Sequence, residues 1–201
     1  MESLPAAPVD AAPLLVRLMR RLENERSLDP AVGFLERVSE PLSAGSVRDL
    51  LLGRQVGHAL HPALTDLPIG LWTSAGLLDL LGGEGSRPAA QLLTGAGVLA
   101  TLPTALTGLA EWREIGTRER RVGVAHAALN TAALTLYAAS WAQRRSGRHR
   151  AGSALSLAAT AFVSASGYVG GHLSVGRKAG YRDPSLAADQ TDQADQATPG
   201  S

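Results

Sequence analysis

The stretch PAAQLLTGAGVLATLPTALTGLA, residues 88–110, contains no Asp, Glu, Lys or Arg. A helix of about 20 residues crosses the roughly 30 Å hydrocarbon core of a bilayer, so this length and composition predict a membrane-spanning helix. The many small residues also suit a membrane helix, because they let helix backbones approach closely in lipid, where packing drives association.

Three more stretches of similar length lie on either side. Residues 122–142 and 151–173 are free of charged residues, and 64–82 contains only Asp66 and Asp79. We therefore predict an all-α, integral membrane four-helix bundle with spans at about 64–82, 88–110, 122–142 and 151–173. Buried helices of a soluble core are the alternative, but such helices are usually shorter and carry polar positions.

The chain outside the spans predicts two flanking regions. In residues 1–47, positions 13–25 form an amphipathic helix whose apolar face carries Leu14, Leu18 and Leu22 beside several arginines. That helix suits either an anionic membrane surface or packing on the rest of the protein. We assign residues 48–176 to the membrane domain and 177–201 to an acidic tail, and we expect both chain ends to be disordered because they are polar or rich in Ala and Pro.

The distribution of charge predicts orientation and excludes some functions. The absence of Cys excludes disulfides, thiolate metal sites and iron–sulfur clusters ligated within this chain. A net charge of +1 gives no basic field for nucleic acid. By the positive-inside rule both termini are expected in the cytoplasm of a bacterial cell, because one side has nine nearby basic residues (Arg48, Arg54, Arg113, Arg118, Arg120, Arg121, Arg177, Lys178 and Arg182) and the other five (Arg87, Arg144, Arg145, Arg148 and Arg150).

Histidines gather at one end of the predicted spans. His61 and His126 begin the first and third spans, His172 ends the fourth, and His58 lies just outside. Ionisable residues at membrane depth are by default candidates for function, so we predict a shared ligand for these four histidines. Glu111, at the end of the second span, is a further candidate metal ligand, and Asn130 and Asp66 are candidates to orient the histidines from the second shell.

Several kinds of chemistry fit this histidine group. Histidines on the first and third helices would clamp a b-type haem from both faces, and histidines with Glu111 would form a transition-metal site of the kind that helix bundles hold. A proton relay needs the same residues without a metal. Histidines at helix ends also serve simply as hydrogen-bonding groups that satisfy the backbone.

The chain also shows signs of an internal repeat. HAALN at 126–130 is similar to HPALT at 61–65, and Gly108 and Gly167 occur late in the second and fourth spans. The pattern predicts two parallel helical hairpins related by a pseudo-twofold axis along the membrane normal, as in some transporters. Short matches in Ala- and Leu-rich helices also arise by chance.

The histidine motifs resemble a known family. The run DLLLGRQVGHALHPALTDLPIGLW at 49–72, with LTGLAEW at 106–112, HAALN at 126–130 and GGHL at 170–173, is similar to the bacterial membrane family labelled domain of unknown function 2231. The resemblance implies a four-helix integral membrane protein without an established activity. Some relatives carry a C-terminal Rieske iron–sulfur domain, which implies an electron-transfer role with an iron–sulfur partner. Ala59 stands where the family often has proline, and both neighbouring histidines are kept.

These observations favour one functional hypothesis over two others. The leading hypothesis is a bacterial inner-membrane protein whose histidines hold haem b or a metal for electron transfer to a separate partner. A structural or interaction protein without a cofactor is the second. A small-solute or proton transporter is the third, and it requires a homo-oligomer because four short helices are few for a pathway.

Overall fold

A computed structural model describes residues 12–185, and its elements in this part of the chain are helices with one isolated β-bridge. Three short helices come first: α1 (Leu14–Asn24), α2 (Asp29–Ser39) and α3 (Gly45–Leu52). Four long helices follow: α4 (Leu60–Leu81), α5 (Arg87–Ala110), α6 (Thr117–Arg145) and α7 (His149–Gly171). The last of these continues into a π-helical turn, His172–Gly176.

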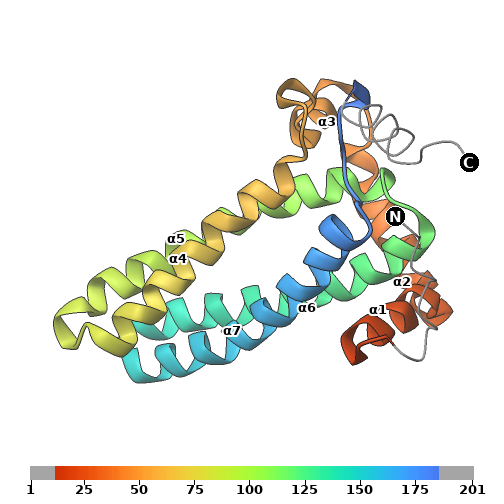
Figure 1. Ribbon diagram of the computed structural model, residues 1–201. Coiled ribbons are helices and arrows are strands. Elements are labelled where there is room, and N and C mark those ends of the chain that lie inside the picture. The colour runs from red at the N-terminus through yellow and green to blue at the C-terminus, as the bar shows by residue number, and fades with distance from the viewer. Residues whose placement is uncertain (1–11, 186–201) are drawn as a thin grey trace, which may run out of the picture.

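The long helices form two antiparallel hairpins, which lie side by side in Figure 1. α4 packs mainly along α5, and α6 packs mainly along α7. The hairpins meet where α5 lies against α6 and α4 against α7, so α4 and α6 stand at opposite corners. Both inter-helix turns lie at one end, called here the turn end; the starts of α4 and α6 lie at the other, called the histidine end (Figure 1).

Three of the long helices are long and apolar enough to cross a membrane. They comprise residues Glu84–Arg113, Thr117–Arg145 and His149–Gly176, counted with their flanking turns. They contain three of the four predicted spans. α4 is not among them. Its sequence includes two aspartates and two prolines, which lower its mean hydropathy. The expectation of an all-helical chain is thus confirmed for the described residues, and three of the four predicted spans lie in helices long and apolar enough to cross a membrane.

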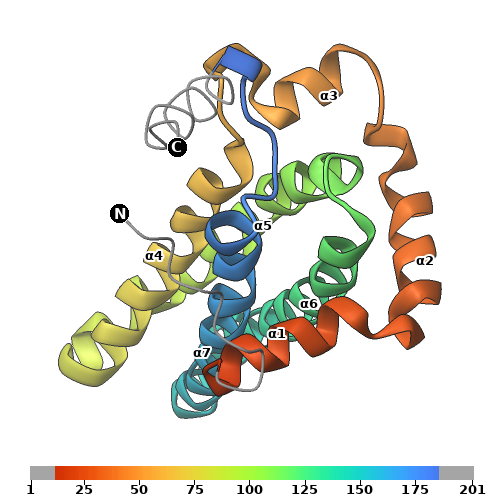
Figure 2. The same ribbon diagram turned by 45° about the vertical axis from the view of Figure 1, so that its right-hand side comes forward.

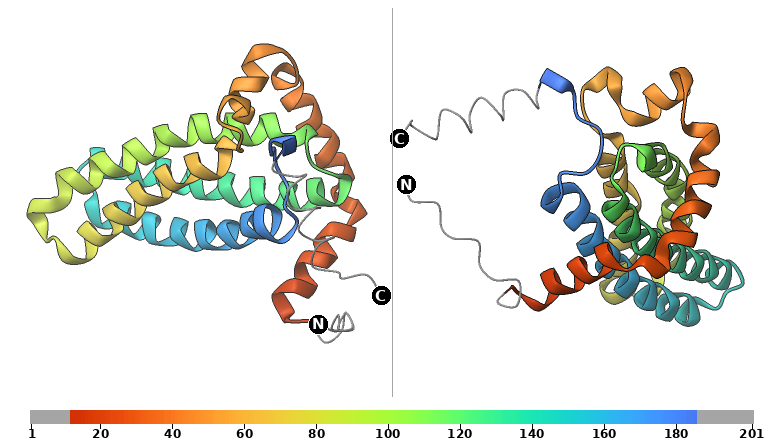
Figure 3. Two further views of the ribbon diagram at one scale, coloured as in Figure 1. Left: turned by 45° about the horizontal axis from the view of Figure 1, so that its top comes forward. Right: turned by 90° about the vertical axis from the view of Figure 1, so that its right-hand side faces the viewer.

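The N-terminal helices cover the histidine end (Figures 2 and 3). α1 packs on α6, where Met19 joins Val122 and Val169 in a buried apolar cluster. The predicted amphipathic helix is therefore confirmed, and one part of its surface packs on the protein. Leu14, Leu15 and Leu18 stay exposed. Ion pairs tie the N-terminal helices to the ends of the long ones: Arg48–Glu114, Arg113–Glu40, Arg120–Glu36 and Arg121–Asp29.

The chain after α7 returns to the loop before α4. His58 and Arg182 form an antiparallel bridge, and the Asp183 backbone N–H donates to the Gly57 carbonyl at 3.2 Å. Residues 177–185 of the predicted tail are therefore ordered, because this bridge and the contacts of Arg177 fix them. The remaining residues for which we predicted disorder, 1–11 and 186–201, lie outside the described part of the chain.

Residues of α4 and α6 meet in three layers at the centre of the two hairpins. His61 lies 6.2 Å from His126, measured between ring centroids. Eleven residues further along each helix, Trp72 stacks on Tyr137 with 3.9 Å between centroids and 8° between planes. Seven residues further still, the two terminal guanidinium nitrogens of Arg144 donate to the Asp79 carboxylate, at 2.8 and 2.5 Å.

Every one of these three pairs joins residues 65 positions apart in the sequence. A twofold axis running between α4 and α6 produces this pattern, because a residue near such an axis contacts its own equivalent. The layers span 18 residues, about 27 Å at 1.5 Å per residue. The contacts therefore support the predicted repeat and extend it along the whole length of the hairpins.

Candidate functional site

The site is built around His61 and His126, the two predicted ligands that the fold brings together. His61 is the second residue of α4, and His126 lies ten residues into the longer α6. Their rings meet edge to face, with 86° between the planes. Both residues are only partly exposed, because α5 and α7 cover the outer side of each ring.

Each histidine is held by the partner helix of its own hairpin. The Nδ1 atom of His61 lies 2.8 Å from the Thr104 carbonyl oxygen on α5. The Nδ1 atom of His126 lies 3.1 Å from the Ser166 carbonyl oxygen on α7. A carbonyl oxygen only accepts, so Nδ1 carries the proton in both rings and Nε2 carries a lone pair. Both imidazoles are thus fixed in the tautomer that presents Nε2 to a ligand.

Two glycines make room for these rings. A Cβ atom added to Gly108 would lie 2.9 Å from Cε1 of His61, and one added to Gly170 would lie 2.8 Å from Cε1 of His126. Real Cβ atoms do not approach so closely, so a larger residue at either position displaces the imidazole. Each glycine lies four positions, one helical turn, after the residue whose carbonyl accepts the hydrogen bond from the histidine.

The structural register of the repeat differs from the predicted one. We matched Gly108 with Gly167, but Gly170 is the glycine that contacts the second histidine, and a Cβ at Gly167 or Gly171 would meet nothing within 4 Å. Thr104 and Gly108 thus correspond to Ser166 and Gly170, both at a spacing of 62. Short Ala- and Gly-rich matches do not fix a register, whereas contacts do.

Asn130 occupies the position predicted for it. Its amide nitrogen lies 3.0 Å from Nε2 of His126, one turn away on the same face of α6. The equivalent residue in the first hairpin, Thr65, instead donates its hydroxyl to the His61 carbonyl at 2.8 Å. Asp66 is exposed and makes no hydrogen bond to His58 or His61 in the described chain. The predicted second-shell contact is therefore present for Asn130 alone.

His172 lies in a separate polar cluster. Its Nε2 atom lies 2.8 Å from Oε1 of Glu23, a carboxylate that is only 2% exposed, and Arg177 also pairs with Glu23. Burial by itself raises the pKa of Glu23, but the hydrogen bonds from Arg177 and His172 outweigh burial and hold that pKa below its ordinary value. Glu23 stands 149 positions before His172, so no local pattern indicates this contact.

His58 and Glu111 also lie apart from the histidine pair. His58 is exposed in the loop that pairs with Arg182. The carboxylate of Glu111 faces Gly180, and its Oε1 atom is buried without a hydrogen-bond partner among the described residues. Within residues 12–185, no group of three or more His, Asp or Glu side chains is placed to hold a metal ion. The expected single cluster of four histidines with Glu111 is thus replaced by a pair and three separate positions.

Arg144 lies at the turn end, where we counted it among the basic residues outside the spans. Its side chain is fully buried and paired with Asp79, and its Nε donates to the Ser140 hydroxyl at 3.2 Å. The spacing of 65 between Asp79 and Arg144 equals that of the two histidines and was the available signal. A buried charge requires a partner of opposite charge, so this ion pair joins α4 and α6 at the turn end.

The fold and the paired central layers define an all-helical membrane protein built from two similar hairpins. A family described as "Predicted membrane protein (DUF2231)" matches residues 57–183, which comprise most of the chain. The protein belongs to this family, as the histidine motifs had suggested. Comparisons with curated proteins and with solved structures found no match.

Proposed function

We propose that the protein is a small inner-membrane electron-transfer protein that holds a b-type haem between His61 and His126. One observation carries the proposal: the Nδ1 atom of each histidine is bound to a backbone carbonyl, at 2.8 and 3.1 Å. Histidines that ligate metals almost always donate their other ring nitrogen in this way, which fixes the ring and raises its basicity.

The two imidazoles lie close enough to share one ligand. Their ring centroids are 6.2 Å apart, and each would hold the haem iron through a metal–nitrogen bond of about 2 Å. The donor set is two neutral imidazoles from facing helices, which suits iron in a haem better than zinc, which takes four ligands, or calcium, which takes oxygens. A bound haem supplies one-electron transfer at this position.

The placement of α4 supports a fourth span. α4 has 22 residues, runs along α5, and directs Trp72 and Asp79 toward the centre, where Tyr137 and Arg144 meet them. Pairing with Arg144 reduces the cost of placing Asp79 at membrane depth. In our proposal four helices span a bacterial inner membrane with both termini in the cytoplasm, as the nine basic residues near the histidine end favour.

The partner in this proposal is a separate iron–sulfur protein. The chain has no Cys and so ligates no such cluster through thiolates itself. His61 lies in the first turn of α4, at the end of the hairpins that α1, α2 and α3 cover. In our proposal this end lies near a membrane surface, where a soluble partner docks. An electron-transfer partner of this kind needs only a small, transient interface.

The test is an absorption spectrum of the detergent-purified protein, oxidised and dithionite-reduced, with metal analysis of the same sample. We expect a Soret band and one iron per chain, both lost in His61→Ala and in His126→Ala. His58→Ala is the matched control, because His58 is exposed and apart from the pair; it should keep the spectrum. A wild-type sample, produced with a haem supply, that shows neither Soret band nor stoichiometric metal rules out the proposal.

One contact favours a second candidate, a membrane protein in which the histidines only join helices. Nε2 of His126 already accepts a hydrogen bond from Asn130, so its lone pair has a partner. Asn130 is exposed and free to turn away when a ligand arrives. The variant Asn130→Ala separates the two functions. A haem protein should keep its Soret band in this variant. A protein in which the histidines only join helices should show no Soret band, and the variant should lose about 1 kcal/mol of stability.

A further inference from the structure

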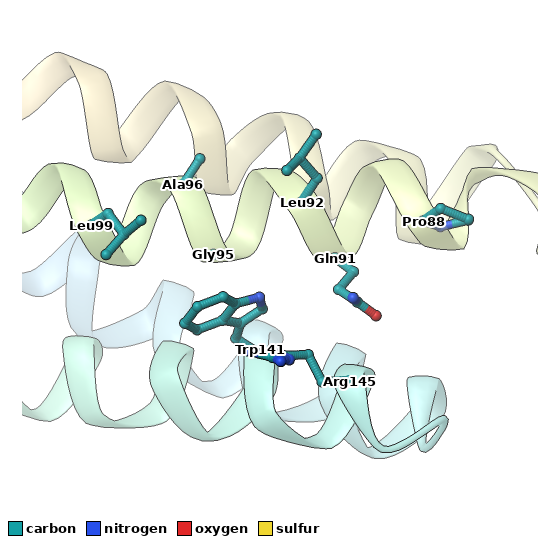
Figure 4. Close-up of a pocket in the computed structure, with 8 residues that line it drawn as sticks. All are labelled: Pro88, Gln91, Leu92, Gly95, Ala96, Leu99, Trp141 and Arg145. Atoms are coloured by element: carbon teal, nitrogen blue, oxygen red, sulfur yellow. The ribbon is translucent and has the colours of Figure 1, made fainter.

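A groove lies on the outer surface between α5 and α6, toward the turn end and away from the histidine pair. Its volume is about 550 Å³, within the range of small-molecule sites. Figure 4 shows Trp141 at its centre, Leu99 at one end, and Gln91 with Arg145 toward the other. Neither the central layers nor the proposed haem function uses these residues.

The floor of the groove is formed by Trp141 against Gly95. A Cβ atom added to Gly95 would lie 2.5 Å from the indole ring, so only glycine lets the ring lie this close to α5. Because the indole fills the space beside Gly95, it forms a flat apolar floor. The groove therefore depends on the contact between Gly95 and Trp141, and the neighbouring side chains leave this contact uncovered.

The groove is apolar along most of its length and basic at one end. Leu92 and Leu99 are 70% and 59% exposed, so they present apolar surface outward. Arg145, the last residue of α6, holds its guanidinium 5.5 Å from the Trp141 ring centroid and forms no ion pair with a described carboxylate. Its neighbour Arg144 is buried and neutralised by Asp79, so Arg145 is the cation of this pair that remains open to a ligand.

The surroundings identify the class of ligand. Both walls belong to helices long and apolar enough to cross a membrane, so the open side of the groove faces lipid. From Gln91 to Leu99 the groove follows α5 for eight residues, about 12 Å at 1.5 Å per residue. Its basic end lies at the end of α6, at the level of lipid headgroups, and arginine pairs with phosphate through two parallel hydrogen bonds.

We propose that this groove is a binding site for an anionic phospholipid of the adjacent leaflet. The phosphate and charged headgroup lie on Arg145 and Gln91, and one acyl chain lies over Trp141 between Leu92 and Leu99. The basic end gives preference for a negatively charged headgroup, and the apolar lining requires the chain. The site is independent of the histidine pair, so it stands or falls separately from the proposed function.

Native mass spectrometry of the full-length, delipidated protein tests the site with two lipids that share the same chains. We expect dioleoyl-phosphatidylglycerol to bind about tenfold more tightly than dioleoyl-phosphatidylcholine. Arg145→Gln should remove that preference. The matched control is Arg150→Gln, an exposed arginine at the same end of the hairpins, which should keep it. Glycerophosphoglycerol, the headgroup without chains, should not displace the bound lipid.

Three results overturn the proposal. The first is equal binding of the two lipids by the wild-type protein. The second is a loss of preference in Arg150→Gln as large as in Arg145→Gln, which indicates a diffuse basic surface. The third is displacement by glycerophosphoglycerol, which indicates a headgroup site without a chain. Arg145 is exposed, so its replacement does not disturb the packed interior.

Discussion

The hairpins α4–α5 and α6–α7 share one plan but treat their central layers differently. At the histidine end, equivalent positions carry the same residue, His61 and His126. In the other two layers the equivalent residues differ: Trp72 faces Tyr137, and Asp79 faces Arg144. Because those two layers tolerate unlike partners, packing alone does not demand an identical pair. The identical histidines accord with the proposed haem, which would use two imidazoles.

The two histidines nevertheless have unequal surroundings. The Thr107 hydroxyl lies 3.4 Å from Nδ1 of His61, whereas the corresponding position in the second hairpin is the apolar Val169. There the Ser166 hydroxyl takes this place, 3.0 Å from Nδ1 of His126. Of these two histidines, only His126 has a hydrogen-bond partner on Nε2 among the described residues. The comparison therefore identifies His61 as the imidazole whose Nε2 is more available.

The largest expected effect on stability comes from the Asp79–Arg144 layer, in which the two hairpins carry opposite charges. Arg144→Met leaves the half-buried Asp79 without its partner and should lower the free energy of unfolding by about 3 kcal/mol. Denaturation in mixed detergent micelles measures it. The adjacent exposed residue supplies the control, Arg145→Met, which should change stability little. Equal effects of the two variants would show that the buried pair does not stabilise the hairpins.

Exchange of the two charges sharpens the same comparison. Asp79→Arg with Arg144→Asp restores the pair but should recover only part of the stability. Gly152 accommodates Arg144, since a Cβ there would lie 2.6 Å from its Cγ atom. The equivalent position in the first hairpin is the fully buried Ala90, which leaves less room for an arginine. Full recovery would mean that the hairpins are interchangeable at this end.

The histidine end should respond equally in both hairpins. Gly108→Ala and Gly170→Ala each push a Cβ atom against an imidazole, so each should destabilise the protein by about 1–3 kcal/mol. Both should also weaken any haem spectrum. Gly167→Ala is the control, because a Cβ there meets nothing within 4 Å and alanine favours the helix. A large effect at only one of the two glycines contradicts their equivalence.

The smallest expected effect concerns α1. Its Glu23 contacts His172 and Arg177, which follow the second hairpin. The folded-state pKa of Glu23 lies below the ordinary 4.5, so this stabilisation is present above that value and is lost as pH falls through the folded pKa. A spin label on Leu18→Cys, the only cysteine in the chain, should therefore become more mobile in acid. Glu23→Gln should show that mobility at neutral pH, at a cost of about 1–2 kcal/mol.

Glu25→Gln is the control for this measurement, because Glu25 is exposed and caps only the backbone N–H of Ser27. It should leave the mobility of the label unchanged at neutral pH. If the label is equally mobile at every pH in the unmodified background, the Glu23 contacts do not hold α1 to the second hairpin.

The sequence predicts helix positions better than helix ends. Residues 88–110 and 151–173 lie within two residues of α5 and α7 in both directions. The window 122–142 falls short of α6 at both ends, because charges limit the membrane span while the helix continues through Arg118 and Arg145. Absence of charge therefore marks the segment that suits a membrane span, and the hydrogen-bonded backbone of the helix extends beyond that segment.

The candidate site was predictable only where the repeat supplied a pattern. His61 and His126 open similar motifs, so their meeting was expected. His172 also lies at the correct end, but its partner Glu23 comes from the N-terminal helix, and nothing near either residue signals that contact. The groups that hold the two histidines are backbone carbonyls, which every residue has, so no residue type indicates them. Contacts between distant segments thus account for the part that sequence reasoning missed.

The Asp79–Arg144 pair is one that two identical copies cannot make. In an exact homodimer of hairpins, a residue beside the axis meets itself, so Asp79 would face Asp79 and Arg144 would face Arg144, each repelled. Joining two copies in one chain lets the halves diverge into complementary partners. Expressed as separate pieces, the two hairpins should therefore associate with each other and not with themselves, as an obligate heterodimer would.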